Sequence, residues 1–113
     1  MYPTPQLSAL EQISQRRSVK AKDLQGPGPS AEQLQTLLDA AARVPDHGKL
    51  GPWRFLCFQD QARQHFGDQL AQRFATLKPE APDAAVAAER ARFMRAPLVI
   101  AVISCVQEHP KIP

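Results

Sequence analysis

The sequence has few cysteines and few histidines, and neither residue type is spaced as a metal or disulfide site requires. Its two cysteines, Cys57 and Cys105, lie far apart and outside any Cys-x-x-Cys pair. The three histidines, His47, His65 and His109, show no metal-ligand spacing. We therefore expect two small buried thiols, rather than a disulfide or a redox centre, and no metal ion.

Long apolar stretches and strong charge are also missing. No run approaches the ~18 apolar residues needed to cross a bilayer. Residues 1–6 lack the basic leader and apolar core of a secretory signal, so we expect a cytoplasmic protein with no membrane partner. The net charge is only +3, from 14 basic and 11 acidic residues, and aromatic residues make up 6%. Without a concentrated basic face bearing stacking aromatics, we expect no nucleic-acid partner, and a small basic nucleic-acid binder is the remote alternative.

Two kinds of catalytic motif are absent as well. No Gly-x-Ser-x-Gly element supplies the nucleophile of an acyl-transfer enzyme. No pair of carboxylates is arranged for hydrolysis of glycosides. We therefore expect neither an acyl-transfer enzyme nor a glycoside hydrolase.

What is present is an ordinary globular composition, with 43% hydrophobic and 22% charged residues in 113. We expect a single domain over 1–113. Ser8-Ala9-Leu10-Glu11 and Ser30-Ala31-Glu32-Gln33 both fit the capping box, so helices are predicted from Ser8 towards Arg17 and from Ser30 to about Arg43. Pro45 stops the second of these.

Two strands are predicted, with helices between them. Residues 53–58 are aromatic-rich and follow Gly51-Pro52, and residues 98–106 are almost continuously β-branched. Asp60 is predicted to cap a helix reaching residue 77, and Asp83 to cap another that carries Phe93.

The second strand makes the fold look incomplete. It is apolar on both faces, which is typical of a central strand covered by helices on either side. The sequence offers one other strand, so an edge of residues 98–106 would stay unpaired. We therefore expect the missing strands to come from residues beyond Pro113 or from a partner chain.

Three clusters, taken in order, resemble the nitroreductase family, and in particular its small bacterial NAD(P)H nitroreductase branch. The resemblance spans nearly the whole chain. The clusters are Arg16-Arg17-Ser18, then Arg43-Val44-Pro45-Asp46-His47 with Gly51-Pro52-Trp53-Arg54-Phe55, and finally Arg95-Ala96-Pro97.

The resemblance implies an α+β fold, a nitroreductase-like three-layer α/β/α arrangement with a central mixed sheet that is incomplete in this chain. It implies a homodimer with flavin mononucleotide (FMN) at the subunit interface. Arg16, Arg17 and Ser18 would bind the phosphate and ribityl side of FMN, and Arg43 and His47 would reach the flavin held mainly by the other subunit.

The activity implied by the resemblance is a ping-pong reduction. NAD(P)H is the electron donor, and a small molecule such as a nitroaromatic, a quinone or a related electrophile is the acceptor. Larger nitroreductases often carry serines after the proline, where this sequence has Asp46-His47, so their substrates are not transferred to this chain. The alternative is a truncated or degenerate nitroreductase-like domain that dimerises without retaining flavin.

Each site residue also has an ordinary structural explanation. Arg16 and Arg17 at the end of a helix would complement its dipole by ~0.3–1 kcal/mol, against ~1.5–3 kcal/mol for each charge-assisted hydrogen bond to phosphate. Ser18 could be a turn hydroxyl, Arg43 has the same dipole alternative, and His47 could be a solvated turn residue. Trp53 is predicted to pack in the core or an interface rather than to stack on a ligand.

Overall fold

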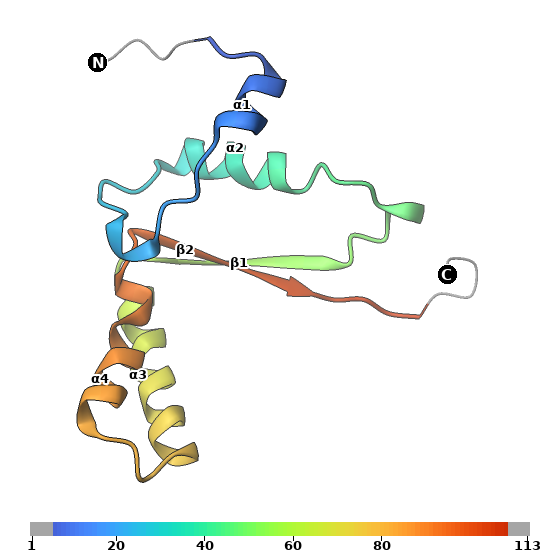
Figure 1. The fold of residues 1–113 in the computed structure, drawn as a ribbon. Helices are drawn as coiled ribbons and strands as arrows, with labels where there is room; N and C mark the ends of the chain where they lie inside the picture. Colours follow the sequence, from blue (N-terminus) through green and yellow to red (C-terminus); the bar gives the residue numbers. More distant parts are fainter. Residues whose placement is uncertain (1–5, 109–113) are drawn as a thin grey trace.

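A computed structural model of the chain describes residues 6–108, apart from the side chain of His47. The elements are, in order, α1 (Ala9–Gln15), η1 (Ala21–Asp23), α2 (Ala31–Ala41), η2 (His47–Lys49), β1 (Trp53–Gln59), α3 (Gln61–Leu77), α4 (Asp83–Ala91), η3 (Arg92–Met94) and β2 (Leu98–Ser104). The predicted α+β class is confirmed. In Figure 1, α3 and α4 form a pair at one end of the two strands, and α1 and α2 lie apart from that pair.

The two capping boxes are formed as predicted. The Ser8 hydroxyl accepts the Glu11 backbone N–H at 3.2 Å, and the Glu11 carboxylate accepts the Ser8 N–H at 2.9 Å. Ser30 and Gln33 exchange the equivalent bonds at 3.1 and 2.9 Å. Each box satisfies two backbone amides that a helix start leaves without partners, which fixes where α1 and α2 begin.

Replacing the cap of α2 tests this directly. Ser30→Ala should destabilise α2 by about 1 kcal/mol, because the Gln33 amide loses its acceptor. Faster hydrogen exchange of the α2 amides is the measurement. Thr36→Ala is the control: Thr36 lies within α2 and its hydroxyl only bonds back to the Glu32 carbonyl, so that variant should exchange no faster. Equal exchange in both variants would contradict the role of the cap.

Two other predicted caps differ in detail. Asp60 occupies the position before α3, but its φ is 49° and its side chain makes no capping bond. Asp83 is already the first residue of α4, and Pro82 stands at the cap without a side-chain bond. Asp60 therefore stands at the predicted cap position without making a capping bond. The prediction that Asp83 caps α4 was wrong by one residue. Phe93 belongs to η3 rather than to α4 itself.

The strands β1 and β2 pair antiparallel along their whole length, from Trp53 opposite Ser104 to Gln59 opposite Leu98. Three phenylalanines hold the helices against the strands. The ring of Phe58 on β1 lies 4.8 Å from that of Phe66 on α3 and 5.1 Å from that of Phe93 on η3. The Phe66 and Phe93 rings are 4.8 Å apart, spacings typical of favourable aromatic pairs.

Helices α3 and α4 approach each other very closely at one glycine. Gly67 is buried, and a Cβ added there would overlap the Arg90 carbonyl oxygen on α4. Nearby, Arg63 on α3 donates from Nη1 to the Ala96 carbonyl at 2.6 Å, which ties α3 to the start of β2. We call the contiguous segment that these contacts organise, residues 53–104, the strand–helix unit.

The core of the chain is small. Among the described residues the buried hydrophobic side chains are those of Ala71 and Ala96. The accessible surface is 9922 Å², whereas a compact monomer of this mass would have about 6,200 Å². The radius of gyration is 18.4 Å, against about 13 Å for a compact domain of this length. The chain therefore leaves much apolar surface uncovered.

The uncovered surface includes the cysteines and part of β2. Cys57 is exposed and Cys105 is half-buried, and both are free thiols. The prediction of two buried thiols was wrong, because no second layer covers this part of the sheet within the described residues. Val102 and Ile103 at the end of β2 are 66% and 40% exposed. In residues 6–108 β2 pairs with β1 alone, so its place in the middle of a mixed sheet stays a prediction.

Within residues 6–108, no helix combines the length and the apolar character that spanning a bilayer requires.

Candidate functional site

The Arg16-Arg17-Ser18 segment leaves the end of α1 in irregular backbone. The backbone N–H of Arg16 closes the last turn of α1 by donating to the Gln12 carbonyl at 3.0 Å. The Arg16 side chain then turns forward, and its Nη1 donates to the Ser18 Oγ at 3.2 Å. All three residues of the segment are exposed, and the Arg16 and Ser18 side chains lie together on the surface.

The chemistry of this segment suits an anion. A guanidinium has five N–H donors and no acceptor, and Arg16 uses one of them on Ser18. A hydroxyl that accepts one hydrogen bond still has a proton to donate. Arg16, Arg17 and Ser18 therefore offer several donors and two positive charges within three residues, the combination that binds phosphate oxygens.

The surplus positive charge of the chain is concentrated beside this segment. Arg16, Arg17, Lys20 and Lys22 lie within seven residues, and the rest of the chain carries one more acidic than basic residue. The ion pairs found in residues 6–108 lie elsewhere, and they join Arg90 to Asp68 at 3.2 Å and Arg92 to Glu89 at 2.7 Å. The stretch 16–22 thus offers cations that no described acidic side chain neutralises.

Arg43 and His47 lie in the connection between α2 and β1. Arg43 follows the cap of α2, donates its backbone N–H to the Ala40 carbonyl at 3.2 Å, and is exposed. The backbone of His47 begins η2, and its side chain lies outside what the structure describes. Asp46, between them, folds its carboxylate back onto the loop and accepts the backbone N–H groups of Leu50 and Gly51.

The structure thus brings some of the expected residues together and not others. Arg16 and Ser18 are directly hydrogen-bonded, and Arg17 stands between them in sequence. No hydrogen bond or ion pair in the described part of the chain joins Arg43 to that segment.

The loop-closing contacts of Asp46 were missed, because the sequence was interpreted there only as a turn. An aspartate followed closely by glycine was the available signal, since aspartate often bonds to backbone amides further along a turn.

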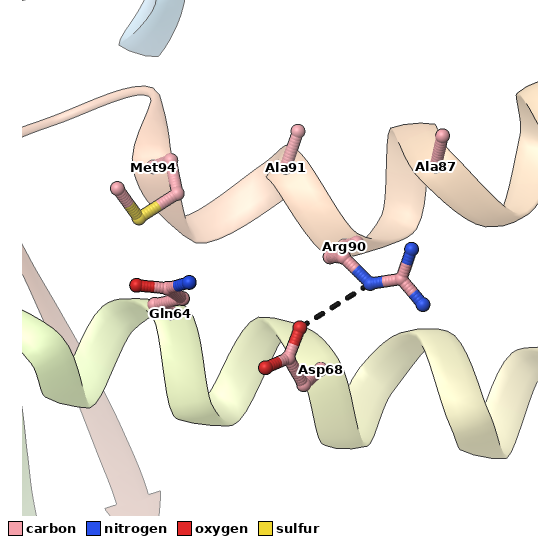
Figure 2. Close-up of a pocket in the computed structure, with 6 residues that line it drawn as sticks. All are labelled: Gln64, Asp68, Ala87, Arg90, Ala91 and Met94. Atoms are coloured by element: carbon pink, nitrogen blue, oxygen red, sulfur yellow. Dashed lines mark ion pairs between the residues drawn. The ribbon is translucent and has the colours of Figure 1, made fainter.

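A surface groove lies between α3 and α4, away from all of these residues. It encloses about 360 Å³ and is lined by Gln64, Asp68, Ala87, Arg90, Ala91 and Met94. Figure 2 shows the Arg90 guanidinium reaching across the groove to Asp68. Since this ion pair satisfies the charges that the groove contains, the groove offers no excess charge to a phosphate. In residues 6–108, no three His, Cys, Asp or Glu side chains gather as a metal site.

Comparison with known proteins decides the family. The model of the nitroreductase family matches residues 13–111. The chain belongs to the nitroreductase family. The matched region of this nitroreductase-family chain contains Arg16, Arg17, Ser18, Arg43 and His47.

Individual relatives agree with the family match. The chain is 36% identical over 107 residues to the Escherichia coli K12 protein named "Putative NAD(P)H nitroreductase YdjA", covering 95% of the chain and 56% of that protein. It is 32% identical over 98 residues to a Haemophilus influenzae protein named "Putative NAD(P)H nitroreductase", covering 87% of the chain and 51% of that protein. This nitroreductase-family chain therefore spans about half the length of these relatives.

Proposed function

We propose that residues 1–113 form the N-terminal part of a single-domain, FMN-dependent oxidoreductase that takes electrons from NAD(P)H. The observation that carries the proposal is the hydrogen-bonded Arg16–Ser18 pair, with Arg17 between them, in the most cationic stretch of the chain. The family match over residues 13–111 and the names of the relatives support it.

In this proposal Arg16, Arg17 and Ser18 hold the phosphate and the ribityl chain. The two guanidinium groups offset the −2 charge of the phosphate and bind its oxygens through bidentate hydrogen bonds. The α1 dipole opposes this site, because a helix C-terminus repels an anion by up to ~1 kcal/mol. Two charge-assisted hydrogen bonds of ~1.5–3 kcal/mol each outweigh that cost, which explains why arginine rather than backbone N–H serves here.

A second copy of the chain completes the site. Arg43 and His47 would reach the flavin held mainly by the partner, which fits the lack of any direct bond between Arg43 and the Arg16–Ser18 pair. The exposed apolar surface supports such an association: Leu10 and Ile13 on α1 are 73% and 70% exposed.

The division of work between protein and coenzyme follows from these residues. When bound, FMN supplies the hydride chemistry, accepting electrons from NAD(P)H and passing them to a small oxidised acceptor in a second half-reaction. The side chains of this chain bind and orient the coenzyme, and none of them acts as a general acid or base. Nitroaromatics, quinones and related electrophiles are the proposed acceptors.

A second candidate function is a nitroreductase-like domain that associates without retaining flavin. It is favoured by the exposure of Arg16, Arg17, Ser18 and Arg43.

Flavin titration separates the two functions. The whole protein should purify yellow, and its apoprotein should quench the fluorescence of added FMN with saturation at one FMN per subunit. The 113-residue chain alone should bind much more weakly, because it lacks the surfaces that enclose the coenzyme. A colourless whole protein that leaves FMN fluorescence unchanged would reject the oxidoreductase and leave the non-retaining domain.

A further inference from the structure

The loop between α2 and β1 is closed by one residue, Asp46. Its Oδ1 accepts the Leu50 backbone N–H at 3.2 Å, and its Oδ2 accepts the Gly51 backbone N–H at 2.8 Å. Its backbone carbonyl accepts the Lys49 N–H at 3.2 Å. These three bonds tie Asp46 to Lys49, Leu50 and Gly51. Asp46 is half-buried, and each of its carboxylate oxygens accepts one backbone N–H of the loop.

The loop needs such a clamp because of its backbone conformation. Gly48, Lys49 and Gly51 all have positive φ, at 77°, 52° and 54°. A lysine at φ 52° is disfavoured by contact between its Cβ and its own backbone. The bonds to Asp46 offset this cost. The far end of the loop is anchored to the sheet, since the Cys105 N–H donates to the Pro52 carbonyl at 2.7 Å.

We propose that Asp46 is a positioning residue for the coenzyme site. Its carboxylate fixes the backbone on both sides of His47, and so fixes the place in the loop from which the proposed function has His47 contact the flavin. The inference rests on the proposed function, because it needs His47 to contact FMN. Asp46 itself touches no coenzyme, since its two oxygens are turned back onto the loop.

Whether Asp46→Ala weakens or tightens FMN binding distinguishes this positioning role from a purely electrostatic effect of the carboxylate. Removing a carboxylate from the neighbourhood of an anionic coenzyme should tighten binding if charge alone mattered. If Asp46 positions the loop, Asp46→Ala should instead weaken FMN binding by about 10-fold or more, as the loss of charge-assisted hydrogen bonds predicts. The measurement is the FMN dissociation constant of the whole apoprotein, obtained by fluorescence quenching.

Two further variants bracket the result. Asp46→Asn keeps one carbonyl oxygen for a loop N–H, so its dissociation constant should fall between those of the wild type and Asp46→Ala. Asp39→Ala is the matched control, because Asp39 on α2 is exposed and accepts only from Gln35 Nε2 at 2.8 Å. It removes the same charge without opening the loop, and it should bind FMN at least as tightly as the wild type.

A double variant tests whether Asp46 acts through His47. Asp46→Ala in a His47→Ala background should cost no further affinity, whereas independent contributions would add. Additive losses, or an Asp46→Ala dissociation constant equal to or below that of the wild type, would overturn the inference. If Asp46→Ala does not fold, unchanged affinity in Asp46→Asn overturns it instead. A wild type that binds no FMN rejects the proposed function itself, which is a different outcome.

Discussion

Arg17→Ala should abolish flavin retention, leaving the whole protein colourless after purification. Arg17 forms no ion pair in the part of the chain that the structure describes, so its guanidinium is available to grip the phosphate in a bidentate manner. Losing two charge-assisted bonds of ~1.5–3 kcal/mol each raises the FMN dissociation constant by about 100-fold or more. The measurement is the FMN titration of the apoprotein, together with the flavin absorbance per subunit of the purified protein.

Two variants control for charge and geometry. Arg73→Ala removes one exposed cation from α3 and should retain the full flavin content. Arg17→Lys keeps the charge but loses the planar fork, so its affinity should lie between those of the wild type and Arg17→Ala. Unchanged flavin content in Arg17→Ala would remove Arg17 from the binding site.

Gly67→Val should lower the free energy of unfolding by about 3 kcal/mol, the upper part of the range for overpacked cores. Any Cβ at this position overlaps the Arg90 carbonyl oxygen, and a backbone atom of a packed helix cannot rotate away as a side chain can. α4 would have to move off α3, which would also stretch the Arg90–Asp68 ion pair. Urea unfolding followed by circular dichroism should show a lower midpoint with an unchanged slope.

The control for this variant is Gln69→Val, which places the same residue at an exposed position two residues further along α3. It changes the helix propensity of α3 but introduces no overlap with α4, so its free energy of unfolding should stay within about 0.5 kcal/mol of that of the wild type. Equal midpoints for the two variants would show that the close approach at Gly67 does not matter for stability.

The parts of the fold that depend on neighbouring residues could be predicted from the sequence. Ser8 with Glu11, and Ser30 with Gln33, determine the helix starts through contacts three residues apart, and both contacts are formed. The two strands follow from β-branched and aromatic runs. The family resemblance carried by Arg16 and its neighbours is likewise a matter of local sequence, and the family match confirms it.

The parts that depend on distant residues could not be predicted in this way. From the sequence alone, Gly67 is expected only to lower the stability of its helix. The close approach of α4 is what shows that a side chain does not fit there. Cys57 lies in a strand, but its exposure depends on which layers cover the sheet. Asp60 was expected to cap α3, yet at its positive φ the side chain makes no hydrogen bond to the first helical amides.

The candidate site, too, has one part that local sequence predicts and another part that only the three-dimensional structure shows. The sequence indicated which residues resemble coenzyme contacts, and the structure adds that Arg16 already holds Ser18. The contacts of Asp46 span four and five residues of irregular backbone. No helical or strand periodicity describes such a segment, so the clamp appears only in three dimensions. The roles of Arg17, Arg43 and His47 stay predictions for the titrations described above.

The strand–helix unit has a consequence for how the protein is made. Its elements are consecutive in the sequence. β1 and β2 pair directly, although α3, α4 and η3 come between them along the chain. On the ribosome, where a chain emerges at ~5–20 residues per second, this unit can close a few seconds after β1 leaves the exit tunnel. It need not wait for any later residue. The outer edges of β1 and β2 then remain open to other nascent chains, so we expect chaperones to shield them until assembly.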